Sequence, residues 1–120
     1  MKQLLALLFV AACCAAYGDQ KVVGTEEGVA SLYADSLDGN ATASGEKYDK
    51  GAMTAAHRTL AFGTKVRVTR KDNGKSVVVV INDRGPHTDA FLIDISGAAA
   101  DKLDMRTEGR VEVELEILGK

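Results

Sequence analysis

Five consecutive β-branched residues at positions 77–81 (VVVVI) form an unbroken apolar stretch in the second half of the chain. Such a stretch has no polar face for water, and it predicts a strand that is buried on both sides. Asn82, Asp83 and Arg84 follow it directly, and Gly85-Pro86 then ends it. Charged residues at the rim of a buried strand are a common place for chemistry. Taken alone, however, this stretch favours a plainer interpretation, in which an Asp–Arg pair only shapes a turn.

Two further stretches alternate between apolar and polar residues, which predicts strands with one face in the core. They are residues 64–70 (TKVRVTR) and residues 110–118 (RVEVELEIL). In the second stretch the expected inward residues are Val111, Val113, Leu115 and Ile117. Between residues 64–70 and a returning strand at 76–82, Asn73-Gly74 predicts a hairpin turn, because both residues tolerate positive φ.

The remaining expected elements are shorter. Residues 28–33, 52–56 and 91–95 predict three strands, and residues 97–103 predict a short helix that Ser96 caps through its hydroxyl. Residues 34–50 are rich in Gly, Asp, Ser and Asn, and they predict a long loop of the kind that often carries function. Six strands and one helix in so short a span indicate a small closed barrel or a sandwich, and the pattern alone does not choose between them.

Composition narrows the classes of function. The 120 residues suffice for one small domain, and the 46% hydrophobic content is that of a globular protein. Trp is absent and aromatic residues make up 5%, so the core has to be built from Val, Ile, Leu and Ala. The net charge is −2, and Lys and Arg are scattered along the chain, which gives no reason to expect nucleic acid as a partner.

Residues 1–18 have the features of a secretion signal. A short positive start precedes an apolar run at residues 4–12, which is too short to span a membrane as a helix. Val10-Ala11-Ala12-Cys13 resembles a bacterial lipobox and predicts cleavage before Cys13, with a lipid anchor on that cysteine. Ordinary secretion, with cleavage after Ala16 or Gly18, is the alternative. Both interpretations place the domain outside the cytoplasm. Residues 19–27 are polar and predict a tether to a domain at residues 28–119.

Cysteine and histidine usage gives no sign of a cross-link or a metal. Cys13 and Cys14 are adjacent, so a structural disulfide is not expected. His57 and His87 lie far apart in the sequence without paired carboxylates at ligand spacing, and we expect neither a metal nor another cofactor. The sequence does not determine the oligomeric state, for which a monomer is the simplest expectation.

Several short motifs follow one another along residues 28–118. They are Gly28-Val29-Ala30-Ser31, residues 42–49 (TASGEKYD), Thr54-Ala55-Ala56-His57, Thr59-Leu60, Gly63-Thr64, residues 82–86 (NDRGP) and Asp94-Ile95-Ser96. In this order and at this spacing they closely resemble the rare lipoprotein A family of bacterial envelope proteins. The resemblance implies a mainly β fold, a six-stranded double-psi β-barrel with one short helix, similar to that of expansins.

The resemblance also implies an activity. Members of the family look like endolytic lytic transglycosylases, which cleave the β-1,4 bond between N-acetylmuramic acid and N-acetylglucosamine in peptidoglycan and leave a 1,6-anhydro end. They are associated with glycan strands that have lost their stem peptides. One alternative is a non-catalytic, expansin-like lipoprotein that binds cell-wall glycan. A further alternative is a structural or inhibitory lipoprotein that kept only the fold. In each case we expect the protein to be located in the periplasm of the bacterial envelope. It is expected either to be anchored by lipid, in the outer membrane, or to be secreted.

Asp83 is the candidate general acid and base. A lytic transglycosylase adds no water, because the C6 hydroxyl of the sugar closes onto C1, so a single carboxyl group can give a proton and then take one. To act as an acid near neutral pH, Asp83 needs a pKa above the usual ~3.9. Burial beside the strand at 77–81 and the nearby charge of Glu46 favour such a rise. We expect Arg84 to point to the opposite face and to hold backbone carbonyls or the loop.

Other residues match the family's active-site positions. Glu46 and His57 complete the expected catalytic set with Asp83. Glu46 is expected to tune the pKa of Asp83 or to stabilise the positive charge that develops at C1. His57 is expected to form a hydrogen bond to the substrate or to orient a carboxylate. The plainer alternatives are a solvated loop charge and a hydrogen-bonded histidine at a strand end. The expected substrate-binding residues are Tyr33, Thr42, Ser44, Tyr48 and Arg84. Asp94 also matches the family, although a structural role is expected for it, and His87 matches no motif.

Two departures from the family pattern concern the substrate. The family usually has Trp-Tyr-Gly where this chain has Leu32-Tyr33-Ala34, so only Tyr33 and Tyr48 are left to stack on a sugar ring. It usually has an arginine where this chain has Asn40, which removes a possible contact to an acidic group of the glycan. The expected barrel and Asp83 are unaffected by these changes, whereas substrate preference depends on them.

Overall fold

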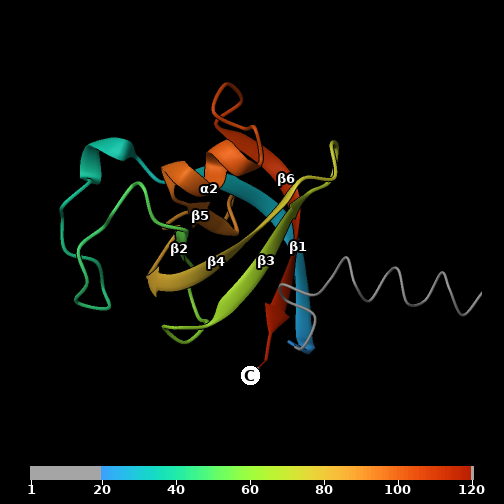
Figure 1. The fold of residues 1–120 in the computed structure, drawn as a ribbon, viewed down its shortest axis with the longest axis horizontal. Coiled ribbons are helices and arrows are strands. Elements are labelled where there is room, and N and C mark those ends of the chain that lie inside the picture. The colour runs from blue at the N-terminus through green and yellow to red at the C-terminus, as the bar shows by residue number, and fades with distance from the viewer. Residues whose placement is uncertain (1–19, 120) are drawn as a thin grey trace, which may run out of the picture.

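The computed structural model describes residues 20–119. Six strands close on themselves to form a barrel, and one short α-helix lies against it (Figure 1). In chain order the elements are β1 (Val22–Leu32), the 3-10 helix η1 (Asp35–Leu37), β2 (Thr54–Ala56), β3 (Lys65–Arg70), β4 (Ser76–Asp83), β5 (Ile93–Ile95), α2 (Gly97–Lys102) and β6 (Arg110–Leu118). The expected signal peptide and the lipidation site at Cys13 lie outside the described residues.

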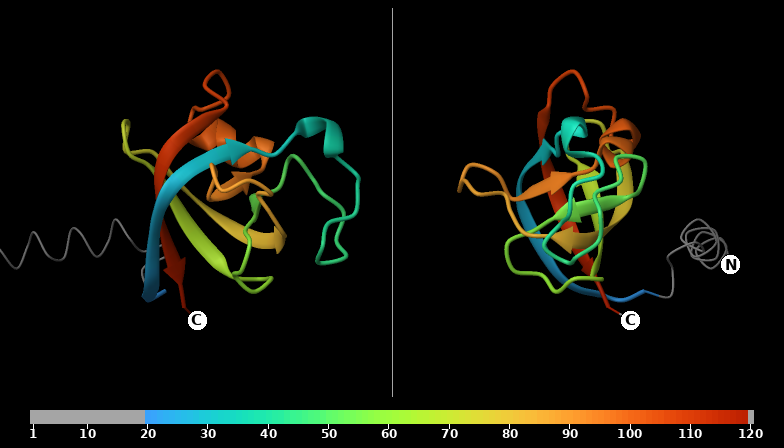
Figure 2. Two further views of the ribbon diagram at one scale, coloured as in Figure 1. Left: turned by 180° about the vertical axis from the view of Figure 1, so that it is seen from behind. Right: turned by 90° about the vertical axis from the view of Figure 1, so that its left-hand side faces the viewer.

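The order of strands around the barrel is β1-β5-β2-β4-β3-β6, and β6 pairs with β1 to close it. Two of the pairs, β1·β5 and β2·β4, are parallel, and the other four are antiparallel. Figure 2 shows that β1 and β4 end on the same side of the barrel, where the segment at residues 33–53 projects from it. The topology therefore brings the end of β4 and the start of this loop together.

The barrel interior is filled by small and branched side chains from all six strands. Val66, Val68, Val79, Ile81 and their neighbours are fully buried, and each such side chain contributes roughly 1.5–3 kcal/mol of hydrophobic stabilisation. The expected strand at 76–82 is confirmed as β4, but it is buried on both faces only in part. Its outward residues Val78 and Val80 are half-buried, so this face of β4 keeps some exposure.

The first strand begins at Val22, so the expected tether at residues 19–27 is wrong for residues 22–27. These residues pair with the far end of β6 and form part of the barrel wall. The sequence hides this strand because its inward positions, which are set by pairing with Leu115 and Val113, are Glu26 and Gly28. Without apolar residues at those positions, no alternation between apolar and polar residues can be read.

Two details of the β3–β4 and β6 segments also differ from expectation. The β3–β4 connection is a longer loop, in which Arg70 N–H donates to the Lys75 carbonyl at 2.8 Å and only Gly74 has positive φ. Asn73 uses its side chain instead, accepting a hydrogen bond from Lys75 N–H at 2.9 Å. In β6 the inward alternation holds as far as Leu115, but Ile117 is half-buried and Leu118 is buried, beside a register shift in the β1·β6 pairing.

The helix α2 is confirmed together with its cap. Ser96 Oγ accepts a hydrogen bond from Ala99 N–H at 3.3 Å and donates one to the Ala52 carbonyl at 2.6 Å. Ala99 and Ala100 are fully buried, which lets the helix lie close to the sheet. Of the helices among residues 20–119, none is long and apolar enough to cross a membrane.

Replacing the capping serine should destabilise the domain. Ser96 is buried and bonded on both sides, so Ser96→Ala removes the cap and leaves the Ala52 carbonyl without this donor. We expect a loss of about 2 kcal/mol in the free energy of unfolding, measured by urea denaturation. Ser36→Ala, in the exposed helix η1, is the matched control and should change it by less than about 0.5 kcal/mol. Equal values for the two variants would contradict this role.

Candidate active site

Four residues form a row across four neighbouring strands, all on the outer face of the barrel. Ser31 of β1 pairs with Asp94 of β5, Asp94 pairs with Ala56 of β2, and Ala56 pairs with Asp83 of β4. Directly paired residues share a face of a sheet, and the preceding residue Ala55 points into the core. The row therefore places two carboxyl groups, Asp83 and Asp94, on one surface with the small side chain of Ala56 between them.

A β-bulge gives Asp83 its outward direction. Ala55 pairs with Ile81, but the next residue, Ala56, pairs with Asp83, so Asn82 is an extra residue in β4. Without this extra residue, Asp83 would alternate with Asn82 and point inward like Ile81. Bulges of this kind often redirect a side chain next to a functional site. Asn82 itself is buried, and its carbonyl accepts a hydrogen bond from Ser44 N–H at 3.3 Å.

The Asp83 carboxylate accepts three hydrogen bonds. The Tyr33 hydroxyl donates to Oδ2 at 2.7 Å, and the backbone N–H groups of Ala43 and Arg84 donate to Oδ1 at 2.9 and 2.8 Å. An ionised carboxylate only accepts hydrogen bonds, so this environment suits Asp83 in its charged form. Burial raises the pKa of Tyr33 well above its usual range, and the hydrogen bond to Asp83 adds to the rise, so Tyr33 keeps its proton and remains a donor.

Asp94 has different surroundings. Burial raises the pKa of its carboxyl group above the ordinary value, and the nearby charge of Asp83 acts in the same direction. The hydrogen bond from the Ser31 hydroxyl and the positive charges of His87 and Arg58 oppose the rise without cancelling it. Asp94 is therefore the carboxyl group of the pair that is better suited to carry a proton. The structural role expected for Asp94 thus understates its position, which is across Ala56 from Asp83.

The side chain of Arg84 turns away from Asp83, as expected. Its Nη1 donates to the carbonyls of His57 at 3.1 Å and Leu60 at 2.7 Å, and its guanidinium lies 4.1 Å from the centre of the Phe62 ring. Arg84 also lines a hollow of about 370 Å³ with Arg58 and His87, beside Gly85.

Glu46, His57 and Asp83, which the sequence predicts as one catalytic set, have different side-chain partners in the structure. His57 is buried, and its ring turns to Glu26 on the inner side of β1, with 2.8 Å between Nε2 and Oε1. The reason is alternation, because His57 follows Ala55 by two positions and shares its inward direction, whereas the bulge turns Asp83 outward. Glu46 is exposed on the loop and accepts a hydrogen bond from Ser44 Oγ at 3.5 Å. It lines a separate hollow of about 460 Å³ together with Asn82.

The other expected substrate-binding residues divide into two groups. Thr42 and Tyr48 are buried, so they shape the loop and do not line a groove. Thr42 Oγ1 donates to the Glu46 carbonyl at 2.7 Å, and the Tyr48 hydroxyl accepts from Gly97 N–H at 3.2 Å. Ser44 and Tyr33 are half-buried and remain available in part. The Tyr33 ring stacks on Tyr48 at 4.1 Å between ring centres, which fixes the phenol that holds Asp83.

Sequence patterns did not indicate the contacts of Asp94, His87 and Glu26. The signal for Asp94 is present, because it lies between two inward residues, Ile93 and Ile95, and must point outward. No comparable signal exists for His87, which follows a proline in a loop. Among residues 20–119, no group of three or more His, Cys, Asp or Glu side chains is placed to hold a metal ion.

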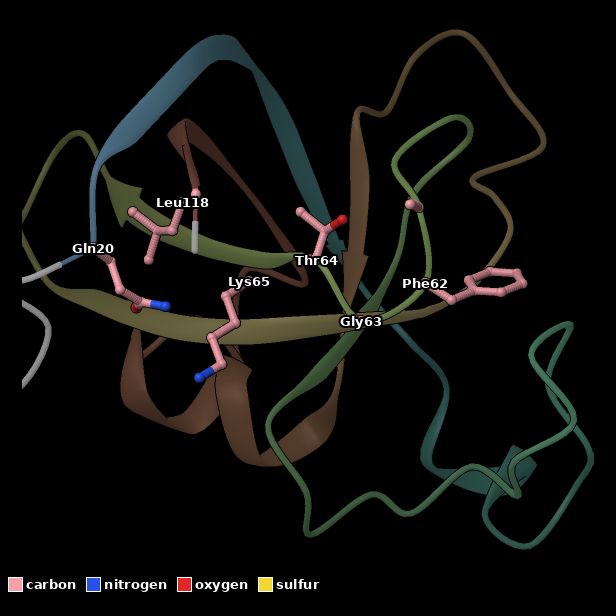
Figure 3. Close-up of a pocket in the computed structure, with 8 residues that line it drawn as sticks. Gln20, Phe62, Gly63, Thr64, Lys65 and Leu118 are labelled. Atoms are coloured by element: carbon pink, nitrogen blue, oxygen red, sulfur yellow. The ribbon is translucent and has the colours of Figure 1, made fainter.

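Another hollow, larger than the two described above, lies away from Asp83 and Asp94. It has a volume of about 500 Å³ and is lined by Gln20, Ala61, Phe62, Gly63, Thr64, Lys65, Leu118 and Gly119. Figure 3 shows that the Phe62 ring and the Lys65 side chain point away from each other. The hollow includes neither Asp83 nor Asp94, and we do not place the chemistry there.

Comparison with known proteins identifies the family. A family model described as "Lytic transglycolase" matches residues 25–115, most of the barrel. The chain belongs to this lytic transglycolase family. The expected resemblance to the rare lipoprotein A proteins is thereby confirmed, and the closed six-stranded barrel is of the double-psi type.

Relatives with high identity carry one name. The "probable endolytic peptidoglycan transglycosylase RlpA" of Treponema pallidum is 56% identical over 89 residues, which cover 74% of this chain and 28% of the relative. The protein of the same name from Nostoc is 52% identical over 96 residues, covering 78% and 26%. The Vibrio cholerae "endolytic peptidoglycan transglycosylase RlpA" is 48% identical over 94 residues, covering 78% and 36%. The chain thus spans about a quarter to a third of the length of these lytic transglycolase relatives.

Solved structures share the fold at lower identity. The Streptomyces papain inhibitor has a TM-score of 0.66 and 23% identity, covering 84% of this chain and all of that one. A Clavibacter michiganensis expansin, solved as a mutant in complex with cellohexaose, has a TM-score of 0.65 and 19% identity, covering 80% and 51%. At this identity these two structures support the fold of the lytic transglycolase barrel and no more.

The raised pKa of Asp94 predicts a pH dependence of stability. The folded protein holds this proton more tightly than the unfolded chain, so the free energy of unfolding falls as the pH rises from the ordinary Asp value through the pKa of the folded state. Asp94→Asn cannot ionise and escapes this loss, while its side-chain oxygen still accepts from Ser31. The difference in unfolding free energy, variant minus native, should therefore increase between about pH 3.5 and about pH 8.

Urea denaturation at a series of pH values measures this difference directly. The groups facing Asp94 are Asp83, His87 and Arg58, and they are present in both proteins, so the subtraction removes most of their own titration. Ser36→Ala, at an exposed position of η1, changes no titratable group, so it is the control and should show a flat difference. A flat difference for Asp94→Asn as well would contradict the raised pKa.

Proposed function

We propose that this domain is an endolytic lytic transglycosylase of peptidoglycan. It cleaves the β-1,4 bond between N-acetylmuramic acid and N-acetylglucosamine and leaves 1,6-anhydro-N-acetylmuramic acid ends. The observation that carries the proposal is the pair of carboxyl groups on one outer face, Asp83 in surroundings that suit the charged form and Asp94 with a raised pKa. The names of the relatives, which are about half identical over the barrel, support the same reaction.

The two carboxyl groups divide the chemistry between them. Asp94 gives its proton to the glycosidic oxygen as the bond from C1 to that oxygen breaks, and positive charge develops at C1. The charged Asp83 stabilises this charge and takes the proton of the C6 hydroxyl as the bond from O6 to C1 forms. The reaction leaves Asp83 protonated and Asp94 ionised, and transfer of one proton through solvent restores the starting state.

The spacing of the row leaves room for a sugar. Asp83 and Asp94 lie two strands apart, on either side of Ala56, which corresponds to about 10 Å between their Cα atoms. The side chain of Ala56 does not reach between them. Tyr33, which donates to Asp83, supplies a partly exposed aromatic ring beside this carboxylate, and aromatic faces commonly stack on sugars.

We also propose that the preferred substrate is glycan without stem peptides. Loss of the peptide uncovers the lactyl carboxylate of muramic acid. The hollow next to Asp94 is lined by Arg58, Arg84 and His87, with Asp89 as its only acidic lining residue. A carboxylate is the group that such a positive surface attracts. The lipid anchor on Cys13 and a periplasmic location belong to this proposal too, and they rest on the lipobox-like sequence.

The alternative is a glycan-binding barrel without catalysis, and one observation favours it. Two arginines that could contact substrate are occupied in holding loops. Arg58 donates to the carbonyls of Pro86, Thr88 and Phe91, and Arg84 donates to two others. Arginines that hold the loops in place can shape a surface that binds a polymer, whether or not the polymer is cut.

A digest of purified glycan tests the reaction. The purified mature protein should release fragments with 1,6-anhydro ends, detected by mass spectrometry. Asp83→Asn and Asp94→Asn should each lower the rate by at least about 100-fold, because each removes one proton transfer. Glu114→Gln, on the exposed face of β6, is the matched control and should be fully active. No products from the native protein, together with glycan binding that survives both substitutions, would favour the binding module.

A change of charge in the hollow lined by Arg58, Arg84 and His87 tests the substrate preference. His87→Glu adds a negative charge beside Arg58, and we expect it to raise KM for peptide-free glycan by about tenfold while leaving peptide-bearing glycan nearly unchanged. His87→Gln changes size and hydrogen bonding without adding charge, so it should have a much smaller effect. The measurement is the rate of anhydro-end formation on both substrates at two salt concentrations. An equal loss on both substrates would count against recognition of the lactyl carboxylate.

A further inference from the structure

Glu26 and His57 form a polar pair on the inner side of the barrel, and this pair has no part in the chemistry proposed above. Glu26 of β1 pairs with Leu115 of β6, whose side chain is fully buried in the core, so Glu26 shares its inward direction. Its Oε1 lies 2.8 Å from Nε2 of His57, whose side chain is only 4% exposed. The Glu26 side chain is 37% exposed, so solvent also reaches this carboxylate, and the buried His57 ring is the group that depends on the hydrogen bond.

The hydrogen bonds of His57 fix the form of its ring. Nδ1 accepts from the backbone N–H groups of Thr59 at 3.1 Å and Leu60 at 3.2 Å. A nitrogen that accepts two hydrogen bonds carries no proton, so the ring proton is on Nε2 and is donated to Glu26. The ring therefore joins the β1 wall to the turn that follows β2.

The same turn contacts the end of β4 and the loop that border the site on the outer face. His57 N–H donates to the Asp83 carbonyl at 3.1 Å, and the His57 carbonyl accepts from Arg84 Nη1 at 3.1 Å. The next residue, Arg58, donates to three carbonyls of the loop at residues 86–91. Gly85 comes just before that loop, and a Cβ on it would lie 3.7 Å from Asp94 Oδ2. The start of the loop therefore packs directly against the second carboxyl group.

We infer that Glu26 is a positioning residue for the reaction at Asp83 and Asp94. It holds the Nε2–H form of His57, and His57 fixes the turn whose backbone and arginines set the ends of β4 and the loop at residues 84–91. Glu26 touches neither the substrate nor the carboxyl groups. Its effect on the rate rests on the proposed function, whereas its effect on the His57 ring does not.

Substitutions at Glu26 separate positioning from simple stability. Glu26→Gln keeps an oxygen that accepts from His57 Nε2–H, and it should retain most of the activity. Glu26→Ala removes the acceptor, and we expect kcat to fall by about 10- to 100-fold with KM nearly unchanged, because displaced carboxyl groups weaken the transition state more than the bound substrate. Glu27→Ala is the matched control, since Glu27 is the next residue on the outer face and pairs with the exposed Lys71.

Nitrogen-15 NMR of the His57 ring supplies a readout that does not depend on activity. The native protein and Glu26→Gln should show one form, with the proton on Nε2 and none on Nδ1, and Glu26→Ala should show exchange between forms. Thermal unfolding confirms that each variant is folded at the assay temperature. If Glu26→Ala is too unstable, Glu26→Met, which restores volume without an acceptor, is used in its place.

Each outcome decides the inference. A folded Glu26→Ala or Glu26→Met protein with the native ring form and native kcat would overturn it. A loss of kcat in Glu26→Gln equal to that of Glu26→Ala would also overturn it, because the hydrogen bond would then not be the cause. If the native protein releases no anhydro products, the proposed reaction fails, and the ring spectra together with glycan-binding affinity still test whether Glu26 holds the turn.

Discussion

The bulge at Asn82 is the constraint on which the site depends. Alternation along a strand assigns every second residue to the core, and in β4 that rule would bury Asp83 behind Ile81. One extra residue reverses the direction from that point onward and brings Asp83 level with Ala56. The pairing of β2 with β5 on its other side then places Asp94 in the same row. The barrel can therefore keep a continuous apolar interior and still present two carboxyl groups outside.

The two carboxyl groups differ because their neighbours differ. Asp83 receives three hydrogen bonds, two from the loop at residues 33–50 and one from the backbone N–H of Arg84, whereas burial dominates at Asp94 and raises its pKa. A carboxyl group that is buried with a raised pKa lowers stability at neutral pH, so Asp94 works against the fold that holds it. Such opposition is common where a residue serves chemistry, and the closed barrel supplies the stability that tolerates it.

Much of this fold could be predicted from local pattern, and the exceptions have physical reasons. Apolar alternation identified β3 and β6, an unbroken apolar run identified β4, and the hydroxyl of Ser96 identified the start of α2. The start of β1 was missed because Glu26 and Gly28 occupy its inward positions. The sequence indicated Asp83 and His57 as site residues, but it did not indicate the bulge beside Asp83 or the hydrogen bond between His57 and Glu26. Neither the bulge nor the partner of a buried histidine is encoded in a short stretch of sequence, because both depend on strands far apart in the chain.

Two small residues, Ala56 and Gly85, determine the shape of the site. Ala56 lies between Asp83 and Asp94 in the row, and Gly85 passes close to it, such that a Cβ on Gly85 would lie 3.9 Å from the Ala56 Cβ and 3.7 Å from Asp94 Oδ2. Gly85 also has a φ of +136°, which residues with a side chain rarely adopt. A larger residue at position 56 would fill the space between the carboxyl groups, and one at position 85 would strain the loop that borders Asp94. The distance across the site is thus set by what is absent from these two positions as much as by the strands that carry the acids.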